Sequence, residues 1–283
     1  MRTDVDHLSI DELRRSREAW WSAEFDDFLW SAFPQASPTR ILDVGCGIGT
    51  FEQHLASRFA PGTAVAGVDI DERRVRAAAS SSSRIAEGSI LTYAVGDALH
   101  LPFRDGWFGA SVVILTLQHV PDPVRVLSEM RRVTAPDGVV IAVEADNTDQ
   151  RLHVPQASAA LDAAFAAYWR RIQASCRPTD IAIGPRLPHL FGQIGLSSPS
   201  VRGYLVALTT RVEPAAFVEQ ARVRFREVAR RHGVEESPEC QALIEIVEGL
   251  AASGSPGFYT IATVPLFLAA ARVPRRSAGA GTR

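Results

Sequence analysis

The sequence predicts an α/β protein with a doubly wound, seven-stranded mixed sheet and helices on both faces. Three observations lead to this fold class. Short apolar segments alternate with segments of helical spacing over about 100 residues. The apolar segments are continuously hydrophobic, which indicates parallel strands buried on both sides. The first of them runs into a glycine-rich turn followed by a helix, as in a βα unit.

The individual elements follow from apolar runs, helical spacing and breaker residues. An N-terminal helix is expected over residues 9–32, where Ser9 and Glu12 can form a capping box and Pro34 ends the segment. The core should hold strands at 41–44, 64–70, 91–95, 111–117 and 139–143, with helices at 51–59, 72–80 and 124–133. Later helices are expected at 150–176, 187–191, 214–232 and 238–252, and strands at 201–209 and 257–272, the last one antiparallel and inserted at the edge.

The points where the alternation of strands and helices stops divide the chain into a sheet core and a helical lid. Helical lid segments are expected at residues 1–37, 148–185 and 211–254, covering the carboxyl edge of the sheet and determining substrate choice. The sheet core should comprise residues 38–147, continue at 186–210 and end with the strand in 255–273. Residues 274–283, rich in Arg, Ser, Gly and Ala, are expected to be disordered.

The composition excludes several classes of protein. All 30 basic residues are arginine, which excludes a lysine Schiff base and a Walker phosphate loop. A net charge of −2 does not indicate a nucleic-acid or membrane partner. Three cysteines without a CxxC pair argue against a disulfide framework or structural zinc. Without a signal-like start or a bilayer-length apolar run, the expected location is cytoplasmic. Arginine pairs such as Arg131-Arg132 are interpreted as solvated helix faces.

The turn after the first strand is the main candidate for ligand binding. Gly45, Gly47 and Gly49 let the backbone turn sharply and approach a ligand closely. A dinucleotide-binding GxGxxG pattern needs glycine at position 50, where this chain has Thr50. Asp43, just before the turn, would repel a pyrophosphate and favour a cationic or ammonium-bearing ligand. The alternative is a tight turn without a ligand.

Two more aspartates follow strands that should end at the same edge of the sheet. Asp69 lies about 20 residues after the glycine turn, where a carboxylate can accept hydrogen bonds from ribose hydroxyls. The alternative role of capping the next helix suits Asp71 better. Asp97 follows the third strand and would reach the cleft at the carboxyl edge.

Together these motifs resemble the class I S-adenosylmethionine-dependent methyltransferases, in particular the ubiquinone-biosynthesis-like group that acts on small molecules. The resemblance spans residues 38–146, about two fifths of the chain. It rests on matches in order at 42–49, 69, 97–98, 101–103, 112–120 and 131–138. The chain departs from the family at Gly109, where an aspartate is usual, and at 136–138, where Pro-Asp-Gly replaces Pro-Gly-Gly.

The resemblance implies S-adenosyl-L-methionine as cofactor in a Rossmann-like methyltransferase fold. The implied cofactor-binding residues comprise the glycine turn with the acid before it, the ends of the next strands and the strand that follows: Asp43, Gly45, Cys46, Gly47, Gly49, Asp69, Ile70, Asp97, Ala98 and Ile114. Asp43 would orient the ammonium of the methionine moiety, and the backbone near Ile114 would accept from it. Asp69 would bind the ribose, with Ile70 and Asp97 at the adenine.

Methyl transfer from a sulfonium requires alignment, and it requires a base only where the nucleophile carries a proton. His119, after the fourth strand, is the first catalytic candidate, as a base or a substrate orienter; the alternative is a structural histidine. Gln118 could hydrogen-bond to substrate or cofactor. Glu144, after the fifth strand, is a further candidate, and its alternative is a surface carboxylate.

Aromatic and histidine side chains in the segments expected to cap the cleft are candidates for substrate contacts, with core packing as the alternative. They are Trp21, His153, Tyr168, Trp169 and His189. Asp146-Asn147 resembles the metal-binding pair of catechol-type methyltransferases. Residues 115–118 lack the acid that such a site also needs, so no metal is expected.

The sequence therefore predicts methyl transfer to a small, partly apolar metabolite at O, N or C, in specialised metabolism. One alternative is an RNA or protein methyltransferase, which would need a basic channel. Others are a regulatory cofactor-binding protein and a fold member that catalyses another reaction, such as a cyclisation. The expected partner is a small molecule rather than nucleic acid or membrane, and a homodimer is left open.

Overall fold

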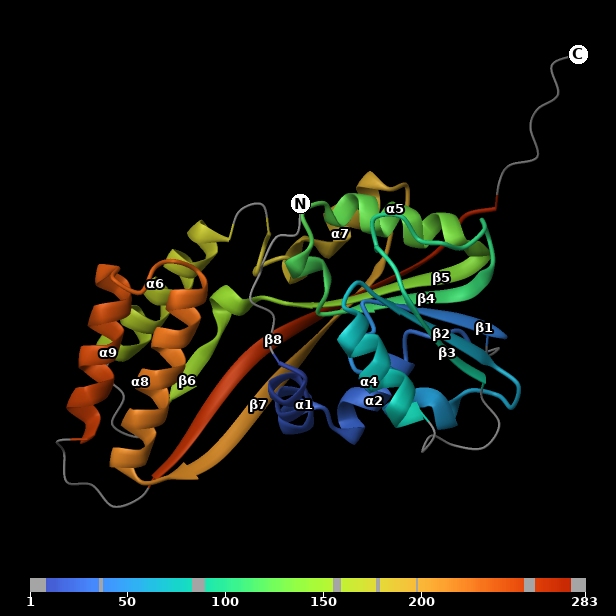
Figure 1. Ribbon diagram of the computed structural model, residues 1–283. Helices are drawn as coiled ribbons and strands as arrows, with labels where there is room; N and C mark the ends of the chain where they lie inside the picture. Colours follow the sequence, from blue (N-terminus) through green and yellow to red (C-terminus); the bar gives the residue numbers. More distant parts are fainter. Residues whose placement is uncertain are drawn as a thin grey trace, which may run out of the picture. The chain divides into compact units, whose positions relative to one another are not determined.

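The computed structural model describes residues 9–35, 38–82, 90–154, 159–176, 179–196, 198–251 and 258–275 (Figure 1). The strands within these ranges are β1 (Arg40–Val44), β2 (Ala64–Asp69), β3 (Ile90–Val95), β4 (Phe108–Ile114), β5 (Thr134–Ala145), β6 (Arg151–His153), β7 (Ser200–Val212) and β8 (Phe258–Arg272). They form an eight-stranded sheet in the order β3-β2-β1-β4-β5-β8-β6, and β7 pairs with β8. The predicted α/β class with a mixed sheet is confirmed. The additional strand, β6, lies where a helix was expected.

Parallel pairing brings the functional motifs to one edge of the sheet. β1 is parallel to both β2 and β4, β2 to β3, and β4 to β5, whereas β6 and β8 are antiparallel. The continuously apolar sequence of β1 is explained by its central position, because Ile41, Leu42 and Val44 are fully buried. The turn after β1 therefore lies between the ends of β2 and β4.

The described residues divide into two compact units. The larger comprises 9–144, 183–204 and 267–275, and the smaller comprises 145–182 and 205–266. In the larger unit, α5 (Pro123–Val133) contacts α7 (Leu187–Gln193) and packs on β4. Figure 1 shows these two helices over one face of the sheet and α4 (Glu72–Ser82), which contacts β2 and β3, over the other. This is the doubly wound arrangement that the sequence predicts.

The N-terminal segment differs from the single helix expected at 9–32. It forms α1 (Ile10–Trp20) and α2 (Ala23–Trp30). The capping box of Ser9 and Glu12 is present at the start of α1. Trp21 has an extended ψ of 120°, and the Ser22 hydroxyl accepts from the Phe25 amide to cap α2. A second N-cap thus interrupts the helical spacing. Both helices belong to the larger unit.

Strand β4 ends earlier and β5 begins earlier than expected. Leu115 has a left-handed φ of 51°, so β4 stops at Ile114 and residues Leu117–His119 form the short helix η2. The expected turn at 136–138 lies inside β5 as a bulge. The register jumps there from Phe108 opposite Thr134 to Ala110 opposite Val139, and Asp137 has a φ of 64°.

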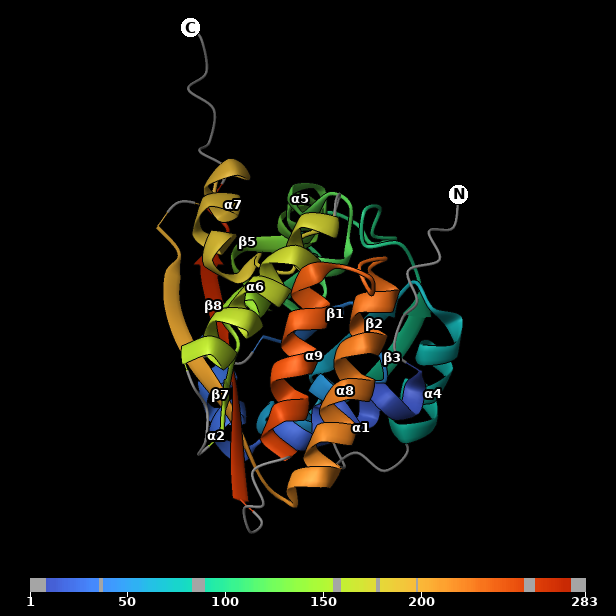
Figure 2. The ribbon, with the colours of Figure 1, turned by 90° about the vertical axis from the view of Figure 1, so that its left-hand side faces the viewer.

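In the smaller unit, α6 (Ala159–Ser175), α8 (Pro214–Arg231) and α9 (Pro238–Ala251) pack side by side, as Figure 2 shows. Their shared core includes Leu161, Phe165, Phe217 and Leu243. The remaining short helices of the described chain are α3 (Thr50–Leu55), η1 (Ala56–Arg58), η3 (Asn147–Asp149) and η4 (Gly184–Arg186). None of the helices in the described ranges has the length and apolarity to span a bilayer. Of the expected disordered tail, residues 276–283 lie outside the described residues.

Candidate functional site

The turn between β1 and α3 is held in a left-handed backbone conformation by its three glycines. Gly45, Gly47 and Gly49 have φ values of 75°, 56° and 77°. The amides of Gly45 and Cys46 donate to the Val68 carbonyl at 2.7 and 3.0 Å, which joins the turn to the end of β2. Glycine is required at these positions because a left-handed φ is strained for other residues.

Gly45 is also required for space. A Cβ atom at this position would lie 2.4 Å from both Oγ1 and Cγ2 of Thr116, which follows β4. The Thr116 hydroxyl in turn donates to the Ile114 carbonyl at 3.2 Å. The ends of β1 and β4 therefore meet here. The backbone near Ile114 thus lies beside the turn, and its contact with the cofactor stays a prediction.

Cys46 contributes its backbone to the turn, whereas its side chain is turned into the protein. The residue is only 6% exposed, and its Sγ and Cβ lie 3.0 Å from where a Cβ on Gly67 would be. Burial raises the pKa of the Cys46 thiol, with nearby carboxylates acting in the same direction. A buried thiol with a raised pKa is a poor nucleophile, which favours a structural role for the Cys46 side chain.

Asp69 fastens the glycine turn to the end of β2. Its Oδ2 accepts from the Gly47 amide and its Oδ1 from the Asp71 amide, both at 2.9 Å. Each oxygen keeps a further lone pair with which to accept from a ligand hydroxyl. Asp71 accepts from the Arg73 amide at 2.9 Å, consistent with the capping role suggested for it. Ile70, between the two aspartates, is 68% exposed and offers an apolar surface beside the turn.

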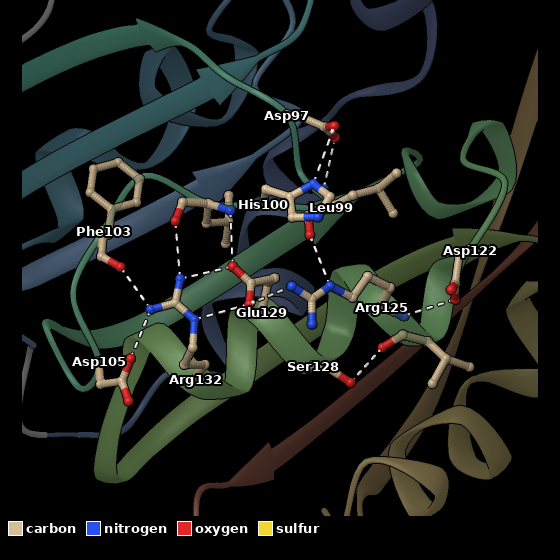
Figure 3. A network of polar contacts seen from close by, with 12 residues as sticks. Asp97, Leu99, His100, Phe103, Asp105, Asp122, Arg125, Ser128, Glu129 and Arg132 are labelled. Carbon is tan, nitrogen blue, oxygen red and sulfur yellow. Dashed lines mark hydrogen bonds and ion pairs between the residues drawn. The ribbon is translucent and has the colours of Figure 1, made fainter.

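Asp97 and Ala98 begin a connection that is tied to α5 by a polar network (Figure 3). The Asp97 carboxylate accepts from the Leu99 amide at 2.8 Å and is half-exposed. Arg132 of α5 donates to the carbonyls of Leu101 and Phe103 at 3.0 and 2.8 Å. Its guanidinium also pairs with Glu129. The network ties the segment that carries Asp97 to α5.

The expectation that Arg131-Arg132 forms a solvated face is therefore wrong. Besides the network around Arg132, Arg131 donates to the Ile194 carbonyl at 2.5 Å. Both arginines bind backbone oxygens of connections that are distant in sequence, which is a structural use of the guanidinium fork.

Glu144 is fully buried, which contradicts the alternative of a surface carboxylate. Its Oε1 accepts from the amides of Thr116 and Leu117 at 2.8 and 2.6 Å, and its Oε2 has no partner among the described residues. Burial raises the pKa of Glu144 to about 8, while these backbone hydrogen bonds act in the opposite direction. Glu144 is therefore hydrogen-bonded to the start of η2, which carries Gln118 and His119. Gln118 is buried and His119 is exposed.

Sequence reasoning missed a buried acid next to the turn. Glu52 of α3 is fully buried, and neither carboxylate oxygen has a partner among the described residues. Burial raises its pKa to about 7. Burial likewise raises the pKa of Asp43, with Glu52 and Asp69 adding repulsion. The available signal was helical spacing, because Phe51 and Leu55 place Glu52 on the buried face of α3.

The expected substrate residues have different environments. Trp21 is buried, donates to Asp26 at 2.6 Å and stacks on His54. Tyr168 is buried in the smaller unit, and its hydroxyl donates to the Phe225 carbonyl at 2.8 Å. These placements favour the core alternative for both. The partly buried Trp169 has an indole N–H without a partner among the described residues. His153 of β6 and His189 of α7 are exposed.

The pair Asp146-Asn147 is engaged in local structure. Asp146 accepts from the amide and the hydroxyl of Thr148 at 2.9 and 2.5 Å. Asn147 donates its side-chain amide to the Ile181 carbonyl at 3.0 Å. Within the described ranges no three His, Cys, Asp or Glu side chains come together as metal ligands would.

The arrangement fits S-adenosyl-L-methionine. The glycine turn provides a backbone cradle that a Cβ would fill, and Asp69 provides an acceptor for ribose hydroxyls. The surrounding carboxylates Asp43 and Glu52 suit the ammonium and sulfonium charges and disfavour a pyrophosphate.

Comparisons with known proteins agree with this assignment. Residues 42–142 match a family model described as a methyltransferase domain. Norajmaline N-methyltransferase of Rauvolfia serpentina is 32% identical over 108 residues, which are 38% of this chain and 36% of that protein. Malonyl-(acyl-carrier protein) O-methyltransferase of Geobacter sulfurreducens is 40% identical over 116 residues, 41% of this chain and 42% of that protein. The chain thus spans about two fifths of the length of these curated relatives.

Solved structures share the fold at low sequence identity. Phosphoethanolamine N-methyltransferase 2 of Haemonchus contortus, in complex with phosphomonomethylethanolamine and S-adenosylhomocysteine, superposes with a TM-score of 0.56 at 17% identity. The match covers 95% of this chain and 59% of that one. The YcgJ protein of Bacillus subtilis gives a TM-score of 0.51 at 15% identity, over 87% of this chain and 96% of that one.

The fold and the matched segment are those of methyltransferase domains. Residues 42–142 are similar to this family, and the other proteins that match the chain over about two fifths of its length include demethylmenaquinone and tocopherol methyltransferases.

Proposed function

We propose that this chain binds S-adenosyl-L-methionine and transfers its methyl group to a small, partly apolar metabolite at an O, N or C atom, in specialised metabolism. The observation that carries the proposal is the hydrogen bond from the Gly47 amide to Asp69 inside a ring of buried acids. This hydrogen bond joins the glycine turn, where the ligand would bind, to Asp69, which can accept from ribose hydroxyls. The nearby carboxylates favour a cationic ligand.

The residues of this chain would act mainly by binding and alignment. When bound, the cofactor supplies an electrophilic methyl group on a sulfonium. Asp69 and the glycine turn would hold its nucleoside and methionine parts, and Ile70 and Asp97 would contact the adenine. Glu144 holds η2 so that Gln118 and His119 stand at the end of β4. His119, which is exposed, would orient the acceptor or take its proton.

Residues outside 42–142 would determine the acceptor. The norajmaline and ajmaline relatives, named for N-methylation of these compounds, support a small acceptor. A net charge of −2 does not favour a nucleic-acid substrate. That Trp169 contacts the acceptor stays a prediction from the sequence; its indole N–H has no partner among the described residues, and it packs on the apolar cluster of the smaller unit.

Calorimetric titration with S-adenosyl-L-methionine and S-adenosylhomocysteine tests the cofactor assignment. Both should bind with micromolar Kd, about 1–100 μM. Asp69→Ala should weaken binding at least about tenfold, because a charge-assisted hydrogen bond is lost. Asp71→Ala, which removes a neighbouring helix cap, is the matched control and should leave binding unchanged. Equal binding by Asp69→Ala and the unmodified chain would contradict the assignment.

Formation of S-adenosylhomocysteine in the presence of a panel of small amines, phenols and carbon acids tests the acceptor class. The proposal expects turnover above the acceptor-free background with at least one of these. Turnover with RNA or protein, and with none of the small molecules, would overturn it.

A further inference from the structure

One face of helix α1 lies against the glycine turn, outside the segment 42–142 that matches the family. The nearest atom to a Cβ built on Gly47 is Cδ2 of Leu13, at 3.5 Å. Arg17 follows Leu13 by four residues, so both side chains are on the same face of α1. The charge of the Arg17 guanidinium interacts at longer range with Asp43 and Glu144, two of the buried acids of this region.

The guanidinium of Arg17 makes no direct polar contact with the described residues. Across the ranges that the structure describes, its guanidinium makes no hydrogen bond and no ion pair within 4 Å, and its ring neighbour is Trp20, with a centroid 5.4 Å away. Arg14, on the same helix, instead pairs with Asp11 at 3.0 Å. A partly buried guanidinium has five N–H donors to satisfy, so a ligand with several oxygen acceptors would complete it.

The charges around Arg17 favour an anionic group of the ligand. Burial lowers the pKa of Arg17 to about 10, so the side chain is still a cation at neutral pH. Asp43 and Glu144 act on this cation only at longer range, since among the described residues neither forms an ion pair with it within 4 Å. Arg17 therefore has a charge that the neighbouring carboxyls do not fully neutralise.

We propose that Arg17 binds the carboxylate of the methionine moiety of the donor, an assignment that rests on the proposed function. The amino-acid end of the donor is a zwitterion, and the turn offers one partner for each charge. Asp43 and Glu52 attract the ammonium, and the guanidinium fork of Arg17 receives the two carboxylate oxygens. Helix α1 thereby takes part in donor binding through a residue that the family motifs do not contain.

Decarboxylated S-adenosylmethionine, which keeps the sulfonium and the amine, tests the assignment by calorimetry. The unmodified chain should bind the intact donor at least about tenfold more tightly than the decarboxylated one. Arg17→Gln should weaken the intact donor by a similar factor and change the decarboxylated one less than about twofold. Arg17→Lys, which keeps the charge without the fork, should restore part of the preference. Arg14→Gln is the matched control and should bind both ligands as the unmodified chain does.

An equal effect of Arg17→Gln on both ligands would mean that the residue only supports α1, and no effect on either would mean that the guanidinium does not reach the donor. Either result would overturn the assignment while leaving the proposed function intact. Failure of the unmodified chain to bind either ligand would overturn the proposed function itself, and the Arg17 assignment with it.

Discussion

Thr116 fills the space that a side chain at Gly45 would need, since a Cβ there would lie 2.4 Å from Oγ1 and Cγ2 of Thr116. Gly45→Ala should therefore lower the free energy of unfolding by more than the strain of a left-handed φ of 75° alone would, because the new methyl group also clashes with Thr116. We expect destabilisation of at least about 2 kcal/mol, measured by urea denaturation, together with weaker donor binding.

Gly62→Ala is the matched control, because Gly62 has a similar φ of 82° and nothing within 4 Å of its Cβ position. It should cost only about 1–2 kcal/mol. Adding Thr116→Ala to Gly45→Ala should recover the difference between the two glycine variants. If the two variants cost the same, contact with Thr116 is not what requires glycine at position 45.

Glu144 should affect stability both as an acceptor and as a titrating group. Glu144→Leu leaves the part-buried amide of Thr116 and the buried amide of Leu117 without this acceptor and should lower the free energy of unfolding by about 2–4 kcal/mol. Because the pKa of Glu144 is raised from 4.5 to about 8, the folded chain binds more protons than the unfolded chain between these values. The free energy of unfolding should therefore fall as pH rises from 5 to about 8.

Glu144→Gln, which keeps an acceptor but cannot ionise, should reduce this fall. Urea denaturation at pH 5 and pH 8 gives the measurement, with the exposed Glu72→Gln as control. An unchanged pH dependence in Glu144→Gln would show that this carboxyl does not titrate in the expected range.

Glu52 should couple donor binding to protonation. Burial raises its pKa to about 7, and it lies among Asp43, Asp69 and Tyr93. A cationic ligand favours the ionised carboxylate, so binding near pH 7 should release protons and affinity should rise from pH 6 to pH 8. Calorimetry in buffers of different ionisation enthalpy measures the release. Glu52→Gln should reduce it, whereas Glu219→Gln, on the exposed face of α8, should not. The same release from both variants would refute the role of Glu52.

Arg132 should stabilise the connection that carries Asp97 (Figure 3). Arg132→Met removes donors to Leu101 and Phe103 and leaves Glu129 without its main partner. We expect a loss of about 1–3 kcal/mol in the free energy of unfolding, with weaker donor binding as a consequence. Arg76→Met, at an exposed pair on α4, should change neither quantity. Equal stability of the two variants would contradict the structural role of Arg132.

Local sequence signals were sufficient for much of the fold. The strands β1 to β3 and the helices α4, α5, α8 and α9 begin and end close to their predicted bounds, because apolar runs, prolines and caps act within a few residues. The glycine turn and Asp69 were also found by local spacing. What could not be predicted depends on contacts between segments that are distant in sequence.

Three residues illustrate this limit. The end of β4 at Ile114 depends on Leu115, whose amide donates to Val143 of the neighbouring strand at 2.8 Å. Arg132 looked like a surface residue because its carbonyl partners lie about 30 residues earlier in the chain. The sequence did not identify Glu52 as a site residue, because its burial depends on how α3 packs on the rest of the protein.

Competition between S-adenosyl-L-methionine and NAD⁺ tests the central claim most directly, since the claim is that an acid-lined glycine turn selects a cationic methyl donor over a pyrophosphate. Equilibrium binding of labelled S-adenosyl-L-methionine should be saturable, displaced by S-adenosylhomocysteine and unaffected by NAD⁺ at millimolar concentration. Displacement by NAD⁺, or the absence of saturable donor binding, would contradict the account.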